Sequence, residues 1–395
     1  MKRTVVIFSM LGVVLAACVS VARADGDNSF RFIVLSDVHV GANDSGSLEK
    51  YTQTVNEIKA MTGANKPAAV FITGDITDSG YESGAYDPNG SGSTYSGQIT
   101  HFKNWIRDPL VNAGIPVYMI LGNHDGNHQS TASEFAAAMG IPLYQSIDIQ
   151  KTHFILTNGV PDNVQGAYGA KGGASWGIGQ AGQIDTTQLN WIESDLQSDN
   201  NTQAKLSIMM NHFPLWGDMG GYAISNTDYW GNTTNAGTKL KQWVAQYGVD
   251  AYLYGHRHND STGKGFALHD NTGALIGSVD YRIQDMDTLF DPADNGHAYT
   301  YDTGVTADIL IEKNVGGAVY TYTNPQGSNK TATYGYDVFD VNDYTLNHYR
   351  KVLDTYYGQQ VGPQQEWSLT VPEPATMGLL ALGGLAMLIR RSRRV

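Results

Sequence analysis

The chain has 395 residues, enough to bury a large core in one or two domains. Hydrophobic residues make up 41% and charged residues 16%, as in globular proteins, and the single cysteine, Cys18, excludes intrachain disulfides and thiolate metal sites. Seven of the 25 basic residues lie in the two chain ends, which hold no acidic residue, so the remaining body has 18 basic and 38 acidic residues and is not expected to bind nucleic acid.

The first residues have the pattern of an export signal. Lys2 and Arg3 precede an apolar run from 5 to 17, and 22–24 reads Ala-Arg-Ala, an A-x-A cleavage site. We therefore expect residues 1–24 to be a signal peptide. The competing interpretation is a lipoprotein signal, because residues 15–18 resemble a lipobox in which Cys18 would be acylated.

The body alternates short apolar runs, which predict buried strands, with stretches whose apolar residues recur at helical spacing. Long polar or Gly-rich stretches between them predict loops at 79–97, 158–183 and 214–232. The predicted helices cover 47–61, a stretch around 102–110, 133–139, 185–196 and 239–247. The predicted strands that carry no candidate ligands include a hairpin at 143–149 and 152–157, and later strands at 265–270, 274–279, 306–312, 317–323, 333–340 and 343–349.

Five other predicted strands each end in side chains that can bind metals or transfer protons. Ligands gather at such strand ends because the following loops are free to carry chemistry. The five strands and the residues that follow them are 30–36 with Asp37 and His39; 68–73 with Gly74, Asp75 and Asp78; 117–121 with Gly122, Asn123, His124 and Asp125; 205–210 with His212; and 250–254 with Gly255, His256 and His258.

Each group alone has an ordinary structural interpretation. Asp-x-His and Gly-Asp are common in turns, a histidine before Phe213 is more often structural than a ligand, and His256 and His258 alone would fit a solvated loop. The order and number of the groups favour convergence at one sheet edge. Imidazole and oxygen donors without thiolate suit Mn, Fe, Zn or Co.

The C-terminal residues form a second sorting pattern. Val-Pro-Glu-Pro at 371–374 precedes a mostly apolar run at 375–389 and then four arginines, Arg390, Arg391, Arg393 and Arg394. This closely resembles the PEP-CTERM signal of exported proteins in Gram-negative bacteria. The resemblance implies transient membrane contact through 375–389 and cleavage by an exosortase-type enzyme. The alternative is a plain membrane anchor, although the run is shorter than the roughly 20 residues that span a bilayer.

The five blocks together resemble the calcineurin-like metallophosphoesterases, whose motifs run D-x-H, G-D-x-x-D, G-N-H-[DE], an isolated His and G-H-x-H. The resemblance implies an α/β fold: a four-layer αββα sandwich of two mixed β-sheets flanked by helices, with a dinuclear metal site at the C-terminal ends of strands. We expect this domain to cover 28–350, followed by a linker at 351–370 and the sorting signal at 371–395.

The resemblance also implies a role for each matching residue. It assigns Asp37, His39, Asp75 and His258 to one metal ion, and Asp75, Asn123, His212 and His256 to a second. It makes His124 the general acid, oriented by Asp78. A hydroxide shared by the two ions would attack the phosphorus, and a neighbouring imidazolium suits protonation of the leaving oxygen.

Two departures from the motifs of known branches narrow the possible branch of the family. Asp78-Ser79-Gly80 replaces the Asp-Arg-Gly of the protein Ser/Thr phosphatases, and purple acid phosphatases place a Tyr after the Gly-Asp block and a Gly where this chain has His39. Neither branch is therefore expected.

Two functions remain open. The first is an exported metal-dependent phosphoesterase that acts on small phosphomonoesters or phosphodiesters, with loop aromatics available to stack on a flat group or simply to cover the core. The second is a surface-displayed binding or matrix protein on a catalytically idle fold. The expected location is the inner membrane first, then the cell surface, periplasm or extracellular matrix.

Overall fold

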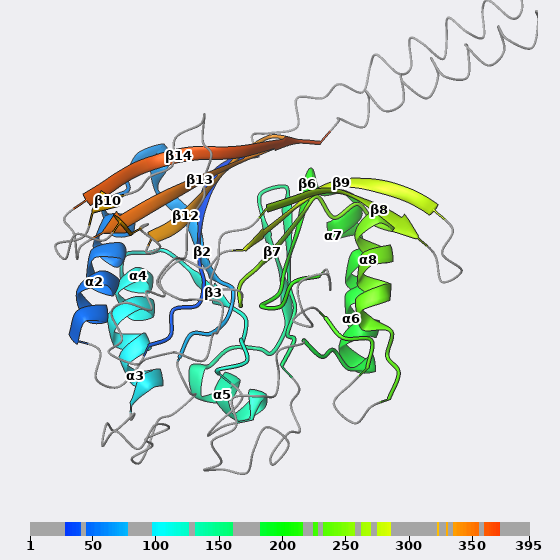
Figure 1. Cartoon of the computed structure of the whole chain (residues 1–395), viewed down its shortest axis with the longest axis horizontal. Coiled ribbons are helices and arrows are strands. Elements are labelled where there is room, and N and C mark those ends of the chain that lie inside the picture. The colour runs from blue at the N-terminus through cyan, green and yellow to red at the C-terminus, as the bar shows by residue number, and fades with distance from the viewer. Residues whose placement is uncertain are drawn as a thin grey trace, which may run out of the picture.

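The structure is a computed structural model, and it describes residues 28–40, 45–77, 97–125, 131–160, 182–215, 224–227, 232–256, 262–269, 275–285, 322–323, 329–330, 335–354 and 359–371. Within these ranges most strands belong to two six-stranded sheets that face each other (Figure 1). Both sheets are mixed, as the resemblance implies. None of the helices in the described ranges is long and apolar enough to span a bilayer.

The first sheet combines three parallel strands from the start of the domain with three antiparallel strands from its end. Its strand order is β14-β13-β12-β1-β2-β3. The strand β12 pairs antiparallel with β1 in an unbroken register, so the end of the domain completes a sheet that its first residues begin. The strands are β1 (Ser29–Leu35), β2 (Pro67–Ile72), β3 (Val117–Met119), β12 (Gly335–Asn342), β13 (Thr345–Asp354) and β14 (Gln359–Thr370).

The second sheet has the order β4-β5-β6-β7-β9-β8. Strands β5, β6, β7 and β9 are parallel, and an antiparallel strand closes each edge. The strands are β4 (Gln145–Ile149), β5 (Thr152–Leu156), β6 (Leu206–Met210), β7 (Ala251–Tyr254), β8 (Thr262–His269) and β9 (Leu275–Asp285). A separate small ribbon joins β10 (Tyr322–Thr323) to β11 (Asn329–Lys330).

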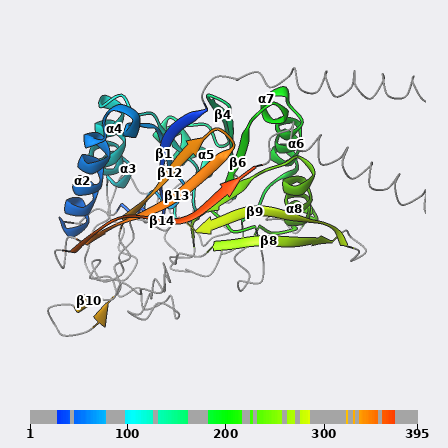
Figure 2. The same ribbon diagram turned by 90° about the horizontal axis from the view of Figure 1, so that it is seen from above.

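Helices cover the outer faces of both sheets, as Figures 1 and 2 show. The first sheet carries α2 (Ser45–Ala60), α3 (Gln98–Phe102), a π-helical turn η2 (Lys103–Arg107) and α4 (Asp108–Asn112). The second carries α6 (Thr186–Leu196), α7 (Asp199–Thr202) and α8 (Ala236–Gln246), while α5 (Ala132–Met139) lies at one end and a 3-10 turn η1 (Gly63–Asn65) precedes β2.

The side-chain alternation of the strands explains the four layers. On β1, Phe32 and Val34 pack against the second sheet, whereas Ile33 and Leu35 point toward the helices, because successive side chains leave opposite faces. The inter-sheet layer includes Phe32 stacked on Phe339 with ring centroids 4.7 Å apart. Burying a side chain of this size stabilises the fold by about 1.5–3 kcal/mol. The predicted αββα sandwich is confirmed.

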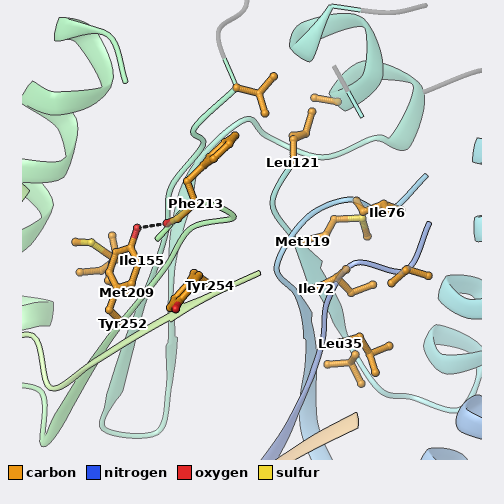
Figure 3. Packing of buried hydrophobic residues seen from close by; sticks show 14 of the residues in the cluster. Leu35, Ile72, Ile76, Met119, Leu121, Ile155, Met209, Phe213, Tyr252 and Tyr254 are labelled. Atoms are coloured by element: carbon orange, nitrogen blue, oxygen red, sulfur yellow. Dashed lines mark hydrogen bonds between the residues drawn. The ribbon is translucent and has the colours of Figure 1, made fainter. Parts of the chain in front are cut away.

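The hydrophobic layers reach the ends of the strands where the candidate ligands begin. Figure 3 shows Leu35, Ile72 and Met119 on one side and Met209 and Tyr252 on the other. On the second of these sides the Tyr252 hydroxyl donates to the Phe213 carbonyl at 2.8 Å, which holds in place a residue adjacent to His212 (Figure 3).

The prediction of a linker at 351–370 is wrong, because most of this segment belongs to two strands. Residues up to 354 belong to β13, and 359–370 form β14, which pairs with β13 along its length. This stretch is polar and contains Gly362 and Pro363, but tertiary pairing at a sheet edge overrides weak strand propensity. The expected strand at 306–312 lies outside the described residues.

Candidate metal centre

The loops after β1 and β2 run side by side and bring the first two blocks together. The Asp37 amide donates to the Gly74 carbonyl at 3.1 Å, and the His39 amide donates to the Asp75 carbonyl at 2.9 Å. Because β1 and β2 are parallel neighbours, their carboxyl ends meet at one sheet edge. The first two predicted blocks therefore form one continuous surface.

Four of the candidate ligands have a left-handed backbone. The φ angle is 48° at Asp37, 47° at His39, 46° at Asp75 and 79° at His256. L-residues with a side chain rarely adopt this region, and holding one there costs about 1–3 kcal/mol. The other non-glycine residues with positive φ in the described ranges lie in turns or before a helix. The strain is therefore concentrated where function is expected.

Asp75 is the centre of the cluster. Its side chain is 1% exposed, its Oδ1 accepts a hydrogen bond from the His124 amide at 2.8 Å, and its Oδ2 lies 3.2 Å from His212 Nε2 and 3.5 Å from His39 Nε2. Burial alone would raise the pKa of Asp75, but the positive charges of His212 and His124 hold it well below its usual value. Asp75 is therefore a carboxylate whose Oδ2 faces two imidazoles.

His212 shows which of its nitrogens is available to a cation. Its Nδ1 lies 2.9 Å from the Thr73 carbonyl, which can only accept, so Nδ1 carries the proton. Its Nε2 lies 3.0 Å from Asn123 Oδ1 as well as close to Asp75. Burial would lower the pKa of His212, yet the Asp75 carboxylate raises it to about 9. Without a metal this nitrogen carries a proton between two oxygens, and a cation held by the same three atoms would take the place of that proton.

Asp37 and His256 meet on the other side of the cluster. The His256 amide donates to both Asp37 oxygens, at 3.0 and 3.1 Å, and the Ser36 hydroxyl donates to Oδ2 at 2.5 Å. The His256 ring lies 5.0 Å from the His212 ring and 4.9 Å from that of Phe213, centroid to centroid. The blocks after β1 and β7, more than 200 residues apart in sequence, are thus in direct contact.

Two overlapping triads present their ligand atoms within 4.8 Å of one another: His39, Asp75 and His124, and Asp75, His212 and His256. Asp75 belongs to both, as a carboxylate that bridges two ions would. The donors are carboxylate and imidazole, and within the described part of the chain Asp75 Oδ2 makes ion-pair contacts with His212 and His39 but no hydrogen bond of standard geometry. These residues fit a pair of cations. His124, assigned as an acid from sequence, lies inside the first triad.

The glycines that precede the candidate ligands have a steric purpose that the sequence did not reveal. A Cβ built on Gly122 would overlap the backbone and carboxylate of Asp75, and one on Gly255 would overlap Ser36 and Asp37. Any side chain at these positions would force the strand ends apart. The close approach of the strands thus depends on a glycine at each junction.

Asp125 joins two of the blocks. Its carboxylate accepts from the amides of Gly122 at 2.9 Å, Ile76 at 3.1 Å and Thr77 at 2.8 Å, and from the Thr77 hydroxyl at 3.0 Å. The side chain is fully buried; burial, and then the charge of Asp75, raises the pKa of Asp125 to about 7. Asp125 therefore fixes the loop that carries Asp75.

The structure brings together Asp37, His39, Asp75, Asn123, His124, His212 and His256. The remaining predicted site residues, Asp78 and His258, lie outside the described residues. The same is true of the loop aromatics considered for substrate stacking, Trp176, Trp216, Tyr222, Tyr229 and Trp230.

Family models match two parts of the chain. The model described as calcineurin-like phosphoesterase matches residues 30–260, and the PEP-CTERM protein-sorting motif matches residues 370–394. No curated protein matches the chain.

Several solved structures are similar in overall shape at low sequence identity. A purple acid phosphatase, PPD1, from yellow lupin (Lupinus luteus) seeds is 13% identical with a TM-score of 0.48 and covers 89% of this chain, which spans only 55% of that protein. A dimetal phosphatase from Danio rerio is 11% identical, with coverage of 85% and 98% and a TM-score of 0.46. PhoD is 11% identical, with coverage of 87% and 73% and a TM-score of 0.48.

Proposed function

Because this chain belongs to the calcineurin-like phosphoesterase family, a family of phosphoester hydrolases, we propose that it is an exported enzyme that cleaves phosphomonoesters or phosphodiesters at a two-metal centre around Asp75. The observation that supports this most directly is the meeting of five strand-end blocks on one buried carboxylate. Two triads share that carboxylate, and each offers ligand atoms within 4.8 Å.

The proposed ligands follow from the triads together with the sequence motifs. One ion would be held by Asp37, His39, Asp75 and His258, and the other by Asp75, Asn123, His212 and His256. When bound, the ions would supply Lewis-acid stabilisation of the phosphoryl oxygens and a lowered pKa for an attacking water. Mn, Fe, Zn or Co suit these donors.

The protein's own residues would hold the metal ligands in place and protonate the leaving oxygen. The Thr73 carbonyl fixes the His212 ring, and the His256 amide and the Ser36 hydroxyl fix the Asp37 carboxylate. We assign His124 as the general acid: a ring nitrogen would give its proton to the leaving alkoxide oxygen. Its amide is bound to Asp75, and its ring lies 4.5 Å from that of His39, so it is held beside the cluster. Asp78 is proposed to orient it.

The PEP-CTERM motif marks the chain for export. We propose that residues 1–24 are removed as a signal peptide, that 375–389 hold the chain at the inner membrane of a Gram-negative bacterium, and that an exosortase-type enzyme cuts within 371–395. The catalytic domain would extend from 28 to the end of β14. Lipidation at Cys18 is the alternative route at the N-terminus.

The test compares hydrolysis of p-nitrophenyl phosphate and bis-p-nitrophenyl phosphate by the full chain. We expect one or both to be cleaved, activity to disappear with a chelator, and activity to return when Mn²⁺ is added back. The ratio of the two rates separates a monoesterase from a diesterase. A chain that binds metal but cleaves neither compound would contradict the proposal and favour the idle scaffold.

A further inference from the structure

The two ends of the folded domain meet at one turn, the β12–β13 turn at Asp343 and Tyr344. The Asp343 amide donates to the Asn28 carbonyl at 2.6 Å, and the Asn28 side-chain amide donates to the Asp343 carbonyl at 2.8 Å. At the other end of the domain, the Val371 amide donates to the Tyr344 carbonyl at 2.9 Å. The chain therefore enters and leaves the domain at the same place.

This place is fixed to both sheets. Asn28 is 1% exposed, its Oδ1 accepts from the Lys151 amide at 3.0 Å, and its Nδ2 donates to the Thr152 hydroxyl at 3.2 Å. The Lys205 ammonium, just before β6, forms an ion pair with Asp343. The contacts come from the first sheet, the β4–β5 hairpin and the start of β6, so the end of the domain is a defined surface.

The metal centre is at the opposite end of the strands. Ser29, at the start of β1, pairs with Asn342, and Thr345 pairs with Thr370, whereas Asp37 follows the far end of β1. A seven-residue strand at about 3.3 Å per residue is roughly 23 Å long. The sandwich thus separates the surface at Asp343 from the Asp75 cluster by the length of its strands.

Apolar segments adjoin this surface in the sequence. The run at 375–389 begins four residues after Val371, a distance that an extended chain covers in at most about 14 Å. Arginines follow that run, and Lys2 and Arg3 precede the apolar run at 5–17 on the N-terminal side. Apolar runs bounded by basic residues suit a bilayer with an anionic surface.

We propose that the end of the sandwich around Asn28, Asp343 and Val371 faces the lipid bilayer while the chain is tethered, so that the metal centre points away from the membrane. The orientation rests on the proposed function for the identity of the centre and for the membrane tether at 375–389. A tethered enzyme in this position would take water-soluble substrate from the external side, and either N-terminal route, cleavage or acylation of Cys18, would be compatible with it.

Energy transfer to labelled lipids measures this orientation directly. The full chain with Cys18→Ser has no other cysteine, so one added cysteine carries one donor dye. Asn342→Cys reports the proposed membrane end, and Ala137→Cys reports the opposite end, because α5 lies between the Asp125 loop and the start of β4; both positions are exposed. The vesicles contain phosphatidylethanolamine and phosphatidylglycerol, with acceptor dye on a small share of the head groups.

We expect several-fold greater energy transfer from position 342 than from 137. Gln203→Cys, an exposed site just before β6 at the same end as Asn342, repeats the measurement if the strand variant folds poorly. Equal transfer from both ends, greater transfer from 137, or failure of the full chain to float with vesicles would overturn the proposal. The readout needs no turnover, so it remains informative even if the phosphoesterase assay fails.

Discussion

Two buried histidine–carboxylate clusters in this molecule use the same residue types for different purposes. Away from the metal centre, His153 on β5 has both ring nitrogens bonded, to Asp148 on β4 at 2.6 Å and to Asp195 on α6 at 3.0 Å. Those carboxylates accept further hydrogen bonds from Asn200 at 2.6 Å and Ser146 at 2.7 Å. Both ring nitrogens of His153 and both carboxylates thus find hydrogen-bond partners within the cluster.

The Asp75 cluster differs in both hydrogen bonding and backbone conformation. Among the described residues, Asp75 Oδ2 makes ion-pair contacts with His39 and His212 but no hydrogen bond of standard geometry, and Asp75 and His39 have positive φ. The residues of the His153 cluster have no such backbone strain. Burial and residue type alone therefore do not mark a site. Incomplete hydrogen bonding together with backbone strain marks a functional site. Four variants test this distinction between the two clusters.

The largest effect is expected from Asp75→Asn. The amide cannot bridge two cations, so the chain should lose most of its bound metal, and its activity should fall by more than the ~100-fold typical of residues that only hydrogen-bond to a ligand. Metal content by mass spectrometry and kcat on p-nitrophenyl phosphate measure both. Full metal occupancy in this variant would remove Asp75 from the centre of the site.

His124→Asn should keep the metals and slow the chemical step by roughly 10²–10⁴-fold. The loss should be smaller for esters with good leaving groups, because these need less protonation. A series of aryl phosphates of different leaving-group pKa measures the trend. Because His124 lies in a triad with His39 and Asp75, loss of metal in this variant would instead make it a ligand.

His153→Gln should affect stability and leave kcat unchanged. Removing one partner of a buried ion pair costs about 3–5 kcal/mol, and we expect the lower end because Asp148 is 44% exposed. Urea unfolding measures the change. His101→Gln, at a partly buried histidine stacked on Trp105, is the matched control and should cost less. A fall in kcat of the folded His153 variant would contradict its structural role.

The smallest expected effect is a pH dependence of the stability that the His153 cluster contributes. Burial would lower the pKa of His153, but hydrogen bonds to Asp195 and Asp148 raise it above 6.5. The protonated His153 ring therefore makes its full contribution to the free energy of unfolding below pH 6.5. That contribution is lost as the pH rises through the raised pKa of the folded state. The stability difference between wild type and His153→Gln should shrink from pH 6 to higher pH. A difference independent of pH would indicate that the ring is neutral throughout.

The sequence predicted the parts of the fold that have strong local signals. Strand ends at Leu35, Ile72 and Met210 lie within one residue of prediction, because apolar runs stop abruptly at polar ligands. His153 and His348 match none of the five motif blocks, and both are structural: His153 is bonded to the partly buried Asp195 and His348 to the buried Asp337.

The remainder depended on tertiary contacts that no local pattern encodes. The Asp125 carboxylate reaches amides almost 50 residues earlier in the chain, and Gly122 is required only because Asp75 lies against it. The strand β14 was missed because its residues do not alternate between polar and apolar, and because Gly362 and Pro363 normally interrupt strands. At a sheet edge a proline is tolerated, since one side of the strand is unpaired.

The edge position of β14 also matters for anyone who prepares this protein in soluble form. A recombinant version that stops at residue 350 would cut β13 short and remove β14 altogether. The backbone groups of β13 would then lie open, and such an edge readily recruits strands from other molecules and aggregates. Ending the chain just after Val371 would retain β14 as the natural sheet edge and leave out the apolar C-terminal run.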